Sequence, residues 1–389
     1  MVRSHEPVAI IHVSTAHLAD DVRIFERECK SLVKTGRFNV SIAASGVLPG
    51  TTAVRHIALP PIPNSRLGRF INGSLRGVML AKKNTALIWH FHDPELIPVA
   101  LWLSRKDVIV IWDAHEDYLS QFSDFGSKNW IPKPIRNSVK GLLSRLLTAI
   151  DRKASGVIAA TPTIAGRYQN QRTVIVGNEV ILDDFIDCQP KFESKRVLFT
   201  GSTGDSHLFN VVVDAVTRHP ELLLVVAGRQ KDDHAMREAR LRLGDRLLYV
   251  GWLYRSELAE EMNRASIGFL TYADTDAYSV ASPTKGFEFA AAGLPVVATP
   301  NQMNQRLLAE GGFGFLCQGF DAHSISSALK TALSDEQAWK NASMAGKKWC
   351  AENGSWTTSE KTLINFYDSL VSFHYSRNKT LRKSSANEW

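Results

Sequence analysis

Short β-rich runs alternate with helical patterns along almost the whole chain, and this alternation limits the possible folds more than any other feature. In the first half, the runs predicted as strands are residues 8–13, 39–43, 86–90, 108–113 and 156–160. The segments between them have the length and apolar spacing of helices. Strands that alternate with helices favour a parallel sheet covered on both faces. The first half is therefore predicted to be an α/β domain.

The same alternation starts again after a polar segment, residues 182–196. In the second half, the runs predicted as strands are residues 197–200, 222–227, 247–250, 267–271 and 295–299. We predict two doubly wound, Rossmann-like domains, residues 1–185 and 186–355, with a ligand cleft between the carboxyl ends of their strands. Residues 356–375 are predicted to form a closing helix that returns toward the N-terminal domain. The basic tail, residues 376–389, is predicted to be frayed or disordered.

The composition is that of a folded globular protein, because 44% of the 389 residues are hydrophobic and 22% are charged. A chain of this length exceeds one ordinary core, which agrees with two domains. The net charge of +7 favours an anionic partner. No motif typical of nucleic-acid binding accompanies that charge, so we expect no nucleic-acid partner.

The four cysteines, Cys29, Cys188, Cys317 and Cys350, are widely separated and form no CxxC pair. This usage favours a reduced, cytoplasmic protein. The N-terminal apolar run and every later one are too short for a membrane span. We therefore expect a cytoplasmic location, with attachment to the inner face of the membrane as an alternative.

The run SPTKGFEFAAAGLPVVATP, residues 282–300, is predicted to be a helix that follows one strand and precedes the next. Ser282 suits the N-cap and Pro283 the first helical position, so free N–H groups and the positive end of the dipole form an anion site. Lys285 in the first turn is unfavourable there unless an anion is bound. Glu288 can accept hydrogen bonds from ribose hydroxyls. The alternative is that Lys285 and Glu288 form an ordinary surface ion pair.

This run resembles the donor-binding segment of retaining GT-B glycosyltransferases of the family 4 type, the glycosyl transferases group 1. Three further segments agree with the resemblance: residues 12–36 with a D-x-R-I-F run, residues 89–100 with H-D-P-E-L, and residues 111–122 with D-x-H-E-D-Y. The resemblance covers nearly the whole chain. It implies the GT-B fold, in which two Rossmann-like domains face a central cleft.

The resemblance also implies roles for single residues. Glu288 is implied to bind the ribose of a nucleotide-diphosphate sugar, and His115 to lie beside the transferred sugar. The further residues implied or predicted to bind the donor are Ser282, Thr284, Lys285, Gly201 and Arg229. The residues predicted for the acceptor or phosphate side are His17, Asp21 and Arg23. Arg23 has an equal alternative, in which it pairs with Asp20 or Asp21.

Two departures from the family pattern leave the donor sugar open. Many members carry a Glu eight positions before the ribose-binding one, where this chain has Val280. Asp276, Tyr278, Ser279 or backbone groups are candidates to replace it. The Gly-Arg and Lys pair common in the family is absent from residues 199–207, which leaves Arg229 and Lys285 to neutralise the diphosphate.

His115 is a candidate on its position as well, because it follows a predicted strand that ends in Asp113 and should therefore reach the cleft. Its imidazole can donate a hydrogen bond to the sugar or the phosphate and respond to charge on the leaving group. A structural histidine is the alternative.

The segments HFHD, residues 90–93, and DAHED, residues 113–117, invite a metal interpretation. Their candidate ligands are His90, His92, Asp93, Asp113, His115 and Asp117. The resembling family carries both motifs without a metal, so we expect no metal. The D-x-D run at Asp274 is predicted to be a solvated turn.

The segment 135–153 is predicted to be an amphipathic helix with basic residues beside its apolar face. The apolar residues are Ile135, Val139, Leu142, Leu143, Leu146, Leu147 and Ile150. Such a face packs on a sheet or lies on an anionic membrane, and peripheral membrane contact stays open between these alternatives.

These observations predict a glycosyltransferase of the retaining, hexosyl type that needs no metal and no cofactor. It moves a sugar from a nucleotide-diphosphate donor to an acceptor hydroxyl. By resemblance alone, the acceptor is a polysaccharide or a lipid-linked glycan. The alternatives are a sugar-nucleotide epimerase or hydrolase, a non-catalytic nucleotide-sugar binding protein, and a metallohydrolase.

Overall fold

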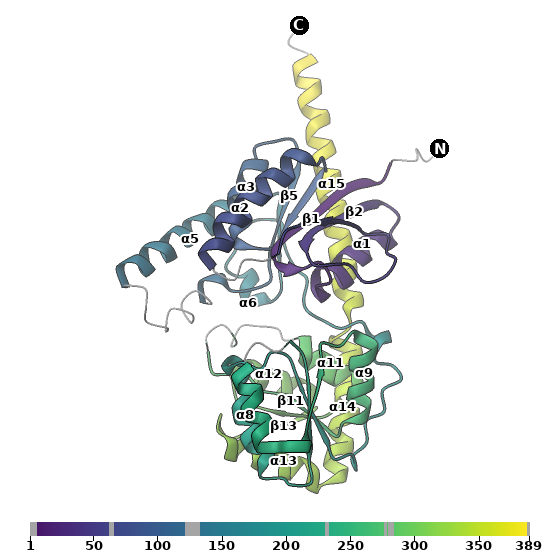
Figure 1. The fold of residues 1–389 in the computed structure, drawn as a ribbon. Coiled ribbons are helices and arrows are strands. Elements are labelled where there is room, and N and C mark those ends of the chain that lie inside the picture. Colours follow the sequence, from purple (N-terminus) through teal and green to yellow (C-terminus); the bar gives the residue numbers. More distant parts are fainter. Residues whose placement is uncertain are drawn as a thin grey trace. The chain divides into compact units, whose positions relative to one another are not determined.

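The computed structural model describes residues 6–61, 66–120, 133–229, 233–275, 278 and 284–386. The chain divides into two compact units (Figure 1). The N-terminal unit is Met1–Gly177 with Thr357–Trp389, and the C-terminal unit is Asn178–Trp356. The division falls before the expected residue 185, because the polar segment already belongs to the C-terminal unit. There, Val180 N donates to Gly354 O at 2.8 Å, and Trp356 N donates to Val180 O at 2.8 Å.

The N-terminal unit contains a seven-stranded sheet in the order β3-β2-β1-β4-β5-β6-β7, with every pair parallel. Its strands are β1 Val8–Leu18, β2 Phe38–Ser45, β3 Arg55–Ala58, β4 Ile88–Phe91, β5 Ile109–Ala114, β6 Gly156–Ala159 and β7 Thr173–Ile175. Its helices are the π-helix η1 Val22–Cys29, α1 Lys30–Lys34, α2 Arg66–Lys83, η2 Pro94–Leu96, α3 Ile97–Leu103, α5 Lys133–Lys153, α6 Pro162–Ala165 and α15 Trp356–Ala386. Right-handed crossovers place α2, α3 and α5 on one face of the sheet and α1 on the other. Tyr367 of α15 packs on the α1 face, where it contacts Phe38.

The C-terminal unit contains a six-stranded parallel sheet in the order β10-β9-β8-β11-β12-β13. Its strands are β8 Arg196–Thr200, β9 Leu223–Ala227, β10 Leu247–Gly251, β11 Ile267–Leu270, β12 Val296–Ala298 and β13 Gly314–Leu316. Its helices are η3 Leu182–Asp184, η4 Asp205–His207, α7 Phe209–Thr217, α8 Asp233–Leu243, η5 Gly244–Arg246, α9 Arg255–Arg264, α11 Thr284–Ala292, α12 Gln302–Gly311, α13 Ala322–Ser334 and α14 Glu336–Asn353. The predicted class, two doubly wound parallel sheets, is confirmed.

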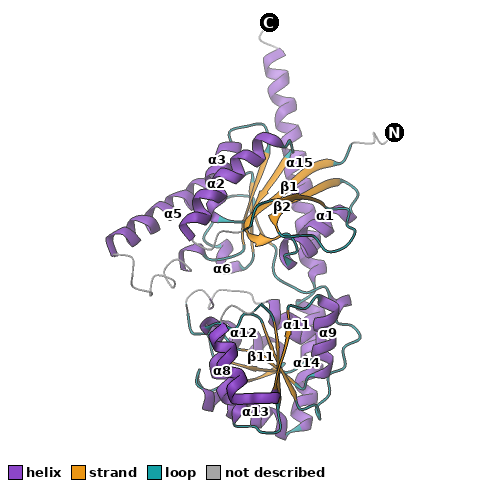
Figure 2. Cartoon of the chain, viewed as in Figure 1, coloured by secondary structure: helices purple, strands orange, loops and turns teal. Residues whose placement is uncertain are grey.

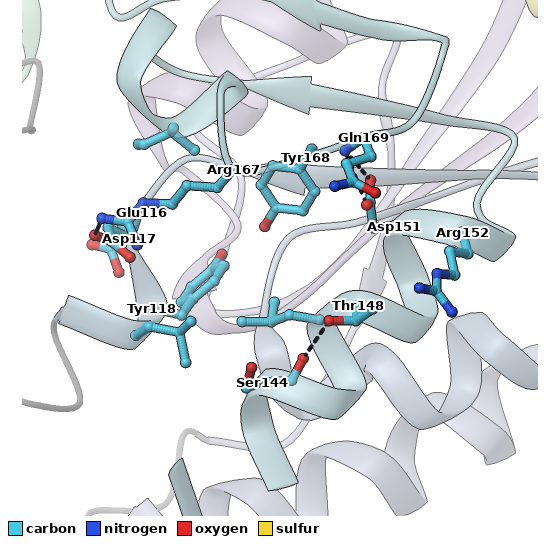
Figure 3. Close-up of a pocket in the computed structure, with 13 residues that line it drawn as sticks. Glu116, Asp117, Tyr118, Ser144, Thr148, Asp151, Arg152, Arg167, Tyr168 and Gln169 are labelled. Atoms are coloured by element: carbon cyan, nitrogen blue, oxygen red, sulfur yellow. Dashed lines mark hydrogen bonds and ion pairs between the residues drawn. The ribbon is translucent and has the colours of Figure 1, made fainter. Parts of the chain in front are cut away.

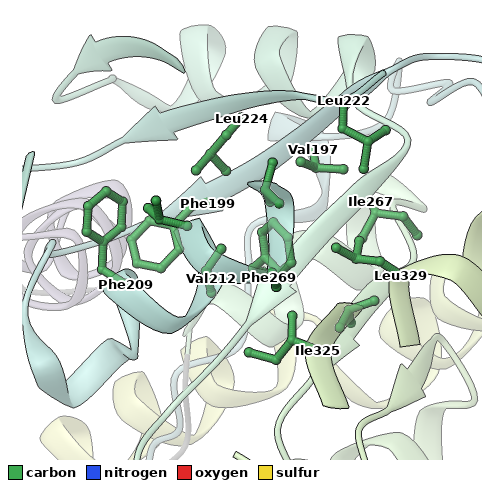
Figure 4. Close-up of a cluster of buried hydrophobic side chains, with 14 of the residues drawn as sticks. Val197, Phe199, Phe209, Val212, Leu222, Leu224, Ile267, Phe269, Ile325 and Leu329 are labelled. Carbon is green, nitrogen blue, oxygen red and sulfur yellow. The ribbon is translucent and has the colours of Figure 1, made fainter. Parts of the chain in front are cut away.

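Helices cover both faces of each sheet (Figure 2). On one face of the C-terminal sheet, Phe199 of β8 and Phe269 of β11 pack with Phe209 of α7 and Leu329 of α13, all nearly inaccessible to solvent (Figure 4). On the other face, Gly268 lies so close to Phe289 of α11 that an added Cβ would approach the ring to 2.6 Å. Because both faces are closed in this way, polar side chains reach a ligand only where the strands end.

The ten predicted strands are all present, and each begins within two residues of its expected start. The sequence did not predict β3, β7 or β13. Each of these three is an edge strand of three or four residues, and such short runs carry a weak apolar signal.

The tail is a correction to the sequence-based expectation. Helix α15 continues to Ala386 instead of ending near residue 375. Residues 374–386 contain no Gly or Pro to stop a helix. The helix is also tied to the N-terminal unit, because Asn378 Nδ2 donates to Asp107 at 3.0 Å.

Candidate functional site

Each sheet has one place where the strand order reverses, between β1 and β4 in the N-terminal unit and between β8 and β11 in the C-terminal unit. The crossovers diverge there and leave room for a ligand at the carboxyl ends of the strands. Gly201 directly follows β8, and His17 lies near the end of β1. The reversal points therefore hold residues from both predicted halves of the site.

In the C-terminal unit, two glycines bring Lys285 against the end of β8. Gly201 has φ +112° and Gly228, after β9, has φ +145°. A Cβ on Gly201 would collide with the Nζ of Lys285, and a Cβ on Gly228 would collide with the carbonyl oxygen of Gly201. Glycine is therefore required at both positions for the lysine to reach this place.

Lys285 is the second residue of α11 and is half-buried, with Nζ 5.3 Å from the centroid of the Tyr272 ring. Burial lowers the pKa of Lys285 to about 7, although Glu288 opposes the shift. Among the residues that the structure describes, Nζ forms no hydrogen bond and no ion pair. A bound anion would stabilise the charged ammonium group at this position.

The other predicted donor residues are placed as follows. Thr284 begins α11, and Glu288 is half-buried one turn further along the same helix. Arg229 is exposed, with its guanidinium 4.5 Å from the Trp252 ring centroid. Ser282 lies outside the described residues, as do Asp276, Ser279 and Val280.

The sequence analysis did not select the rings of His207 and Tyr272, which lie beside Lys285. The His207 and Tyr272 rings are 5.2 Å apart, and Tyr272 and Tyr278 are 4.8 Å apart. Nδ1 of His207 lies 3.1 Å from the hydroxyl of Ser202. Tyr272 lies two residues after β11, so its place beyond a strand at the reversal point was a usable signal.

In the N-terminal unit, His17 and His115 are joined, with their Nε2 atoms 3.1 Å apart. Nδ1 of His17 lies 3.3 Å from Asp21 Oδ2, and Nε2 lies 3.6 Å from Asp93 Oδ1. Asp21 also caps η1 by accepting from the N–H groups of Arg23 and Ile24. The structure therefore brings together His115, His17 and Asp21 at the carboxyl edge of the N-terminal sheet.

The two histidines differ in charge. Burial alone would lower the pKa of His17, but its hydrogen bond to Asp21 and the nearby carboxylates raise that pKa to about 10. Burial lowers the pKa of His115, and Asp113 only partly opposes this. At neutral pH, a charged His17 thus donates to the Nε2 atom of a neutral His115.

Asp93, two residues after β4, holds the part of β1 that carries His17. Its Oδ2 accepts from Ser14 Oγ and Thr15 N, both at 2.7 Å, and from Ala16 N at 3.2 Å. The carboxylate of Asp93 is 2% exposed, so these contacts form a fixed connection between β1 and β4.

Arg23 requires a correction. Its side chain is buried, and its Nε and Nη2 atoms donate to the carboxylate of Asp113 at 3.3 and 3.1 Å. Nε also lies 3.3 Å from Glu28. The carboxylate partners are therefore Asp113 and Glu28 instead of Asp20 or Asp21, and the burial of the guanidinium argues against a phosphate-binding role.

The two metal-like motifs do come together inside the N-terminal unit. Within the described chain, three groups lie close enough to hold an ion: His12, Glu28, His90 and His92; His17, Asp93 and His115; and His92, Asp113 and His115. Hydrogen bonds already join several of their nitrogens, including His12 Nδ1 to His92 Nε2 at 3.0 Å. Asp117 is separate from these groups and pairs with Arg167 at 2.5 Å. Asp274 is exposed, as predicted for a turn residue.

A pocket of about 280 Å³ lies beside residues 116–119, against α5 and the segment around Tyr168 (Figure 3). Its polar lining includes Asp117, Thr148 and Arg167. The hydroxyl of Tyr118 donates to the carbonyl of His92 at 2.9 Å. Glu116, the residue after His115, therefore belongs to the pocket lining, and the lining suits a polar ligand.

The predicted amphipathic helix, α5, is buried in one part of its apolar face and exposed in another. Ile150 is fully buried against the sheet, whereas Val139 and Leu142 are 44% and 54% exposed. Within the described residues, no helix is long and apolar enough to cross a membrane.

Comparison with known proteins matches residues 183–349 to the glycosyl transferases group 1 family. The phosphatidyl-myo-inositol mannosyltransferase of Mycolicibacterium smegmatis is 27% identical over 302 residues, which cover 72% of this chain and 76% of that protein. The predicted resemblance to this family is therefore supported over residues 183–349.

Solved structures resemble nearly the whole chain in fold. Sucrose-phosphate synthase from Thermosynechococcus elongatus has a TM-score of 0.70 at 17% identity, covering 94% of this chain and 99% of that one. Anabaena HepE in complex with UDP and glucose has a TM-score of 0.68 at 14% identity, covering 93% and 100%. WaaG, a glycosyltransferase involved in lipopolysaccharide biosynthesis, has a TM-score of 0.67 at 15% identity, covering 92% and 98%. The fold is that of GT-B glycosyltransferases, as predicted.

Proposed function

We propose that the protein transfers a hexosyl group from a nucleotide-diphosphate sugar to an acceptor hydroxyl, with retention of configuration. The observation that carries this proposal is the position of Lys285. A half-buried cation without an ion pair among the described residues lies against Gly201, at the strand reversal of a group 1 domain. A diphosphate supplies the missing negative charge. HepE, whose structure contains UDP-glucose, supports the class of donor.

In this proposal, Lys285 and the start of α11 neutralise the diphosphate, and Glu288 accepts hydrogen bonds from the ribose. Negative charge accumulates on the diphosphate as the glycosidic bond breaks, so a fixed cation there stabilises the transition state more than the ground state. The pKa of Lys285, about 7, rises when the anion binds, and the lysine is then fully charged during the reaction.

His115 acts with His17 in the N-terminal unit. A neutral imidazole that accepts a hydrogen bond from a charged neighbour has its remaining N–H fixed on Nδ1. Nδ1 is buried and lies 4.0 Å from Asp113 Oδ1, so this N–H faces the carboxylate, and a sugar or phosphate oxygen would have to approach the imidazole from the side of His17. No protein nucleophile and no metal take part, so a chelator should leave the activity unchanged.

The acceptor in the proposal is a glycan, either a polysaccharide or a lipid-linked chain. The pocket beside Tyr118 supports it, because carboxylates, hydroxyls and arginines line the walls. A carbohydrate presents hydroxyls that match such groups.

We further propose that an anionic membrane surface presents this acceptor. Helices α2 and α5 lie on the same face of the sheet, and their sequences hold eleven Lys and Arg residues against one acidic residue. The acidic residue, Asp151, is buried and accepts from the backbone of Gln169. Along the outer side of α2, Ile71, Leu75 and Met79 are 53%, 57% and 53% exposed at a spacing of one helical turn. Apolar side chains set among cations suit a lipid surface.

The function is tested by incubating the purified protein with UDP-, GDP-, ADP- and dTDP-sugars, with and without acceptor glycans. Release of the nucleoside diphosphate only when an acceptor is present supports transfer. Turnover without an acceptor indicates the hydrolase or epimerase alternative, and binding without turnover indicates a non-catalytic binding protein. Analysis of the product by NMR gives the anomeric configuration and so tests retention.

The membrane proposal is tested by cosedimentation with vesicles of anionic and of zwitterionic lipid. Leu75→Ser combined with Leu142→Ser should abolish binding to anionic vesicles, whereas Leu241→Ser, which alters a still more exposed leucine of the C-terminal unit, should leave it unchanged. Equal binding by both variants would contradict the assignment of this face.

A further inference from the structure

A chain of hydrogen bonds crosses the interior of the N-terminal unit, from α15 to β5. The hydroxyl of Tyr367 on α15 lies 3.3 Å from His12 Nε2. His12 Nδ1 lies 3.0 Å from His92 Nε2, and His92 Nδ1 lies 3.0 Å from Asp113 Oδ2. All four side chains are inaccessible to solvent. Such a buried polar chain is costly unless each member is satisfied.

The direction of the chain follows from its Asp113 end. A carboxylate only accepts, so His92 Nδ1 donates to Asp113 and its Nε2 accepts from His12 Nδ1. Nε2 of His12 then accepts from the hydroxyl of Tyr367. The Tyr367 oxygen in turn accepts from His90 Nδ1 at 2.7 Å. Neutral imidazoles meet all these requirements, and burial lowers the pKa of both His12 and His90.

Arg23 continues the chain beyond Asp113. While two of its nitrogens bind that carboxylate, its Nη1 donates to the carbonyls of Val176 and Gly177, both at 3.0 Å. Gly177 is the last residue before the chain enters the C-terminal unit. Its own N–H donates to Ser359 Oγ on α15 at 3.1 Å. Both segments that connect the two units are thus tied to one buried network.

Asp113 is where this network meets His115. The two residues point to the same face of the strand, because side chains alternate along β5. Asp113 Oδ1 lies 4.0 Å from His115 Nδ1. The guanidinium of Arg23 fixes the orientation of this carboxylate and neutralises its charge. If Arg23 were lost, a buried and unpaired carboxylate would remain beside the imidazole.

We propose that Arg23 and the chain Asp113–His92–His12–Tyr367 are positioning residues for His115, and that they hold the end of β5 in a fixed relation to the two connecting segments. This inference rests on the role of His115 in the proposed transfer reaction. None of these side chains needs to touch the substrate. Arg23 therefore differs from a phosphate ligand in its expected kinetics, since it acts on turnover instead of binding.

The test compares Arg23→Lys and Tyr367→Phe with matched controls. Arg196→Lys alters a half-buried arginine whose Nη2 binds Glu261 at 2.7 Å in the C-terminal unit, and Tyr375→Phe removes an exposed hydroxyl of the same helix α15. Arg23→Lys should lower kcat about tenfold with the donor KM unchanged. Tyr367→Phe should lower kcat less, and both controls should match the wild type. A raised donor KM with normal kcat in Arg23→Lys would identify a phosphate ligand and overturn the proposal.

A second measurement does not depend on activity. In protein labelled with 15N histidine, NMR reports the tautomer and surroundings of each imidazole. Tyr367→Phe removes a hydroxyl that belongs to the chain, and the proposal expects the signals of His92 and His115 to shift. Unchanged His115 signals in both Tyr367→Phe and Arg23→Lys would overturn the positioning role, even if transfer itself is confirmed. Shifted signals in a protein without transferase activity would support the positioning and reject the proposed function alone.

Discussion

The carboxyl edges of the two sheets share a strand reversal but differ in the chemistry of their side chains. At the N-terminal edge, the charged side chains have partners. His17 lies close to Asp93, which also accepts from the N–H of Thr15, and Arg23 pairs with Asp113. At the C-terminal edge, two glycines make room for Lys285, whose ammonium forms no ion pair with the described residues. The charges at the first edge are paired, whereas among the described residues of the second edge Lys285 has Glu288, one turn along α11, as its nearby carboxylate.

This difference indicates that the two edges contribute to different steps, donor binding and turnover. A network whose charges are already paired is preorganised and contributes geometry to a reaction. A half-buried cation without a counterion is destabilised until a ligand arrives, so part of the binding energy comes from relieving that cost. Substitutions at the C-terminal edge should therefore change donor binding, and those at the N-terminal edge should change turnover.

The largest effect is expected from Gly201→Ala. The added Cβ would occupy the place of Lys285 Nζ, and φ +112° is unfavourable for alanine. Donor affinity should fall about 100-fold or more, because the lysine must leave the site. Isothermal titration with the preferred sugar nucleotide measures this loss. Gly244→Ala is the matched control, because it has φ +55° with nothing within 4 Å of the added Cβ. Equal affinity in the two variants would show that donor binding does not need Lys285 at the end of β8.

The next effect concerns pH and Lys285. Its pKa is about 7 in the folded protein and lies well above that in the unfolded chain, so the unfolded state binds more protons between these values. Lys285 should therefore lower the stability of the free protein most below about pH 7, with the cost fading as the pH rises toward 10. Thermal unfolding should show Lys285→Met more stable than wild type at low pH and equal to it at high pH.

The same pKa predicts proton uptake on binding. Above pH 7 the free lysine is largely neutral, and a diphosphate recharges it. Calorimetry at pH 8 in two buffers of different ionisation enthalpy should show net uptake in the wild type and none in Lys285→Met. Affinity that does not weaken as the pH rises from 7 to 9 would remove Lys285 from the anion site.

The sequence predicted the fold well because both sheets are buried on both faces, which makes central strands such as residues 108–113 and 267–271 strongly apolar. It also selected His115 and His17 as candidates from their places near strand ends, but it did not predict that their Nε2 atoms lie 3.1 Å apart. It could not predict the partner of Arg23, because Asp113 is 90 residues away and only the folded sheet brings them together. The role of Gly201 was equally hidden, since positive φ and a lysine from α11 meet there only in three dimensions.

A smaller effect is expected from His115→Ala at the N-terminal edge. The loss of one hydrogen-bond donor beside the reacting groups should lower kcat about tenfold to 100-fold, with donor KM changed little. Steady-state kinetics at a series of donor concentrations measures both kcat and the donor KM. His219→Ala, a half-buried histidine of the C-terminal unit that bonds Ser326, is the control and should retain full activity. A raised donor KM with unchanged kcat in His115→Ala would assign His115 to donor binding. It would contradict the proposed difference between the two edges.

The smallest effect is expected from Glu288→Gln, which keeps the size and one acceptor oxygen of the side chain. If the carboxylate of Glu288 accepts hydrogen bonds from both ribose hydroxyls, the amide retains one of them, and affinity should fall about tenfold. The wild type should discriminate against a 2′-deoxyribose donor, and Glu288→Gln should discriminate less, because the contact that reads the hydroxyl is already weakened. Competition binding with ribose and deoxyribose nucleoside diphosphates gives both ratios. Undiminished discrimination in the variant would mean that Glu288 serves only to modulate Lys285, whose pKa it raises across one turn of α11.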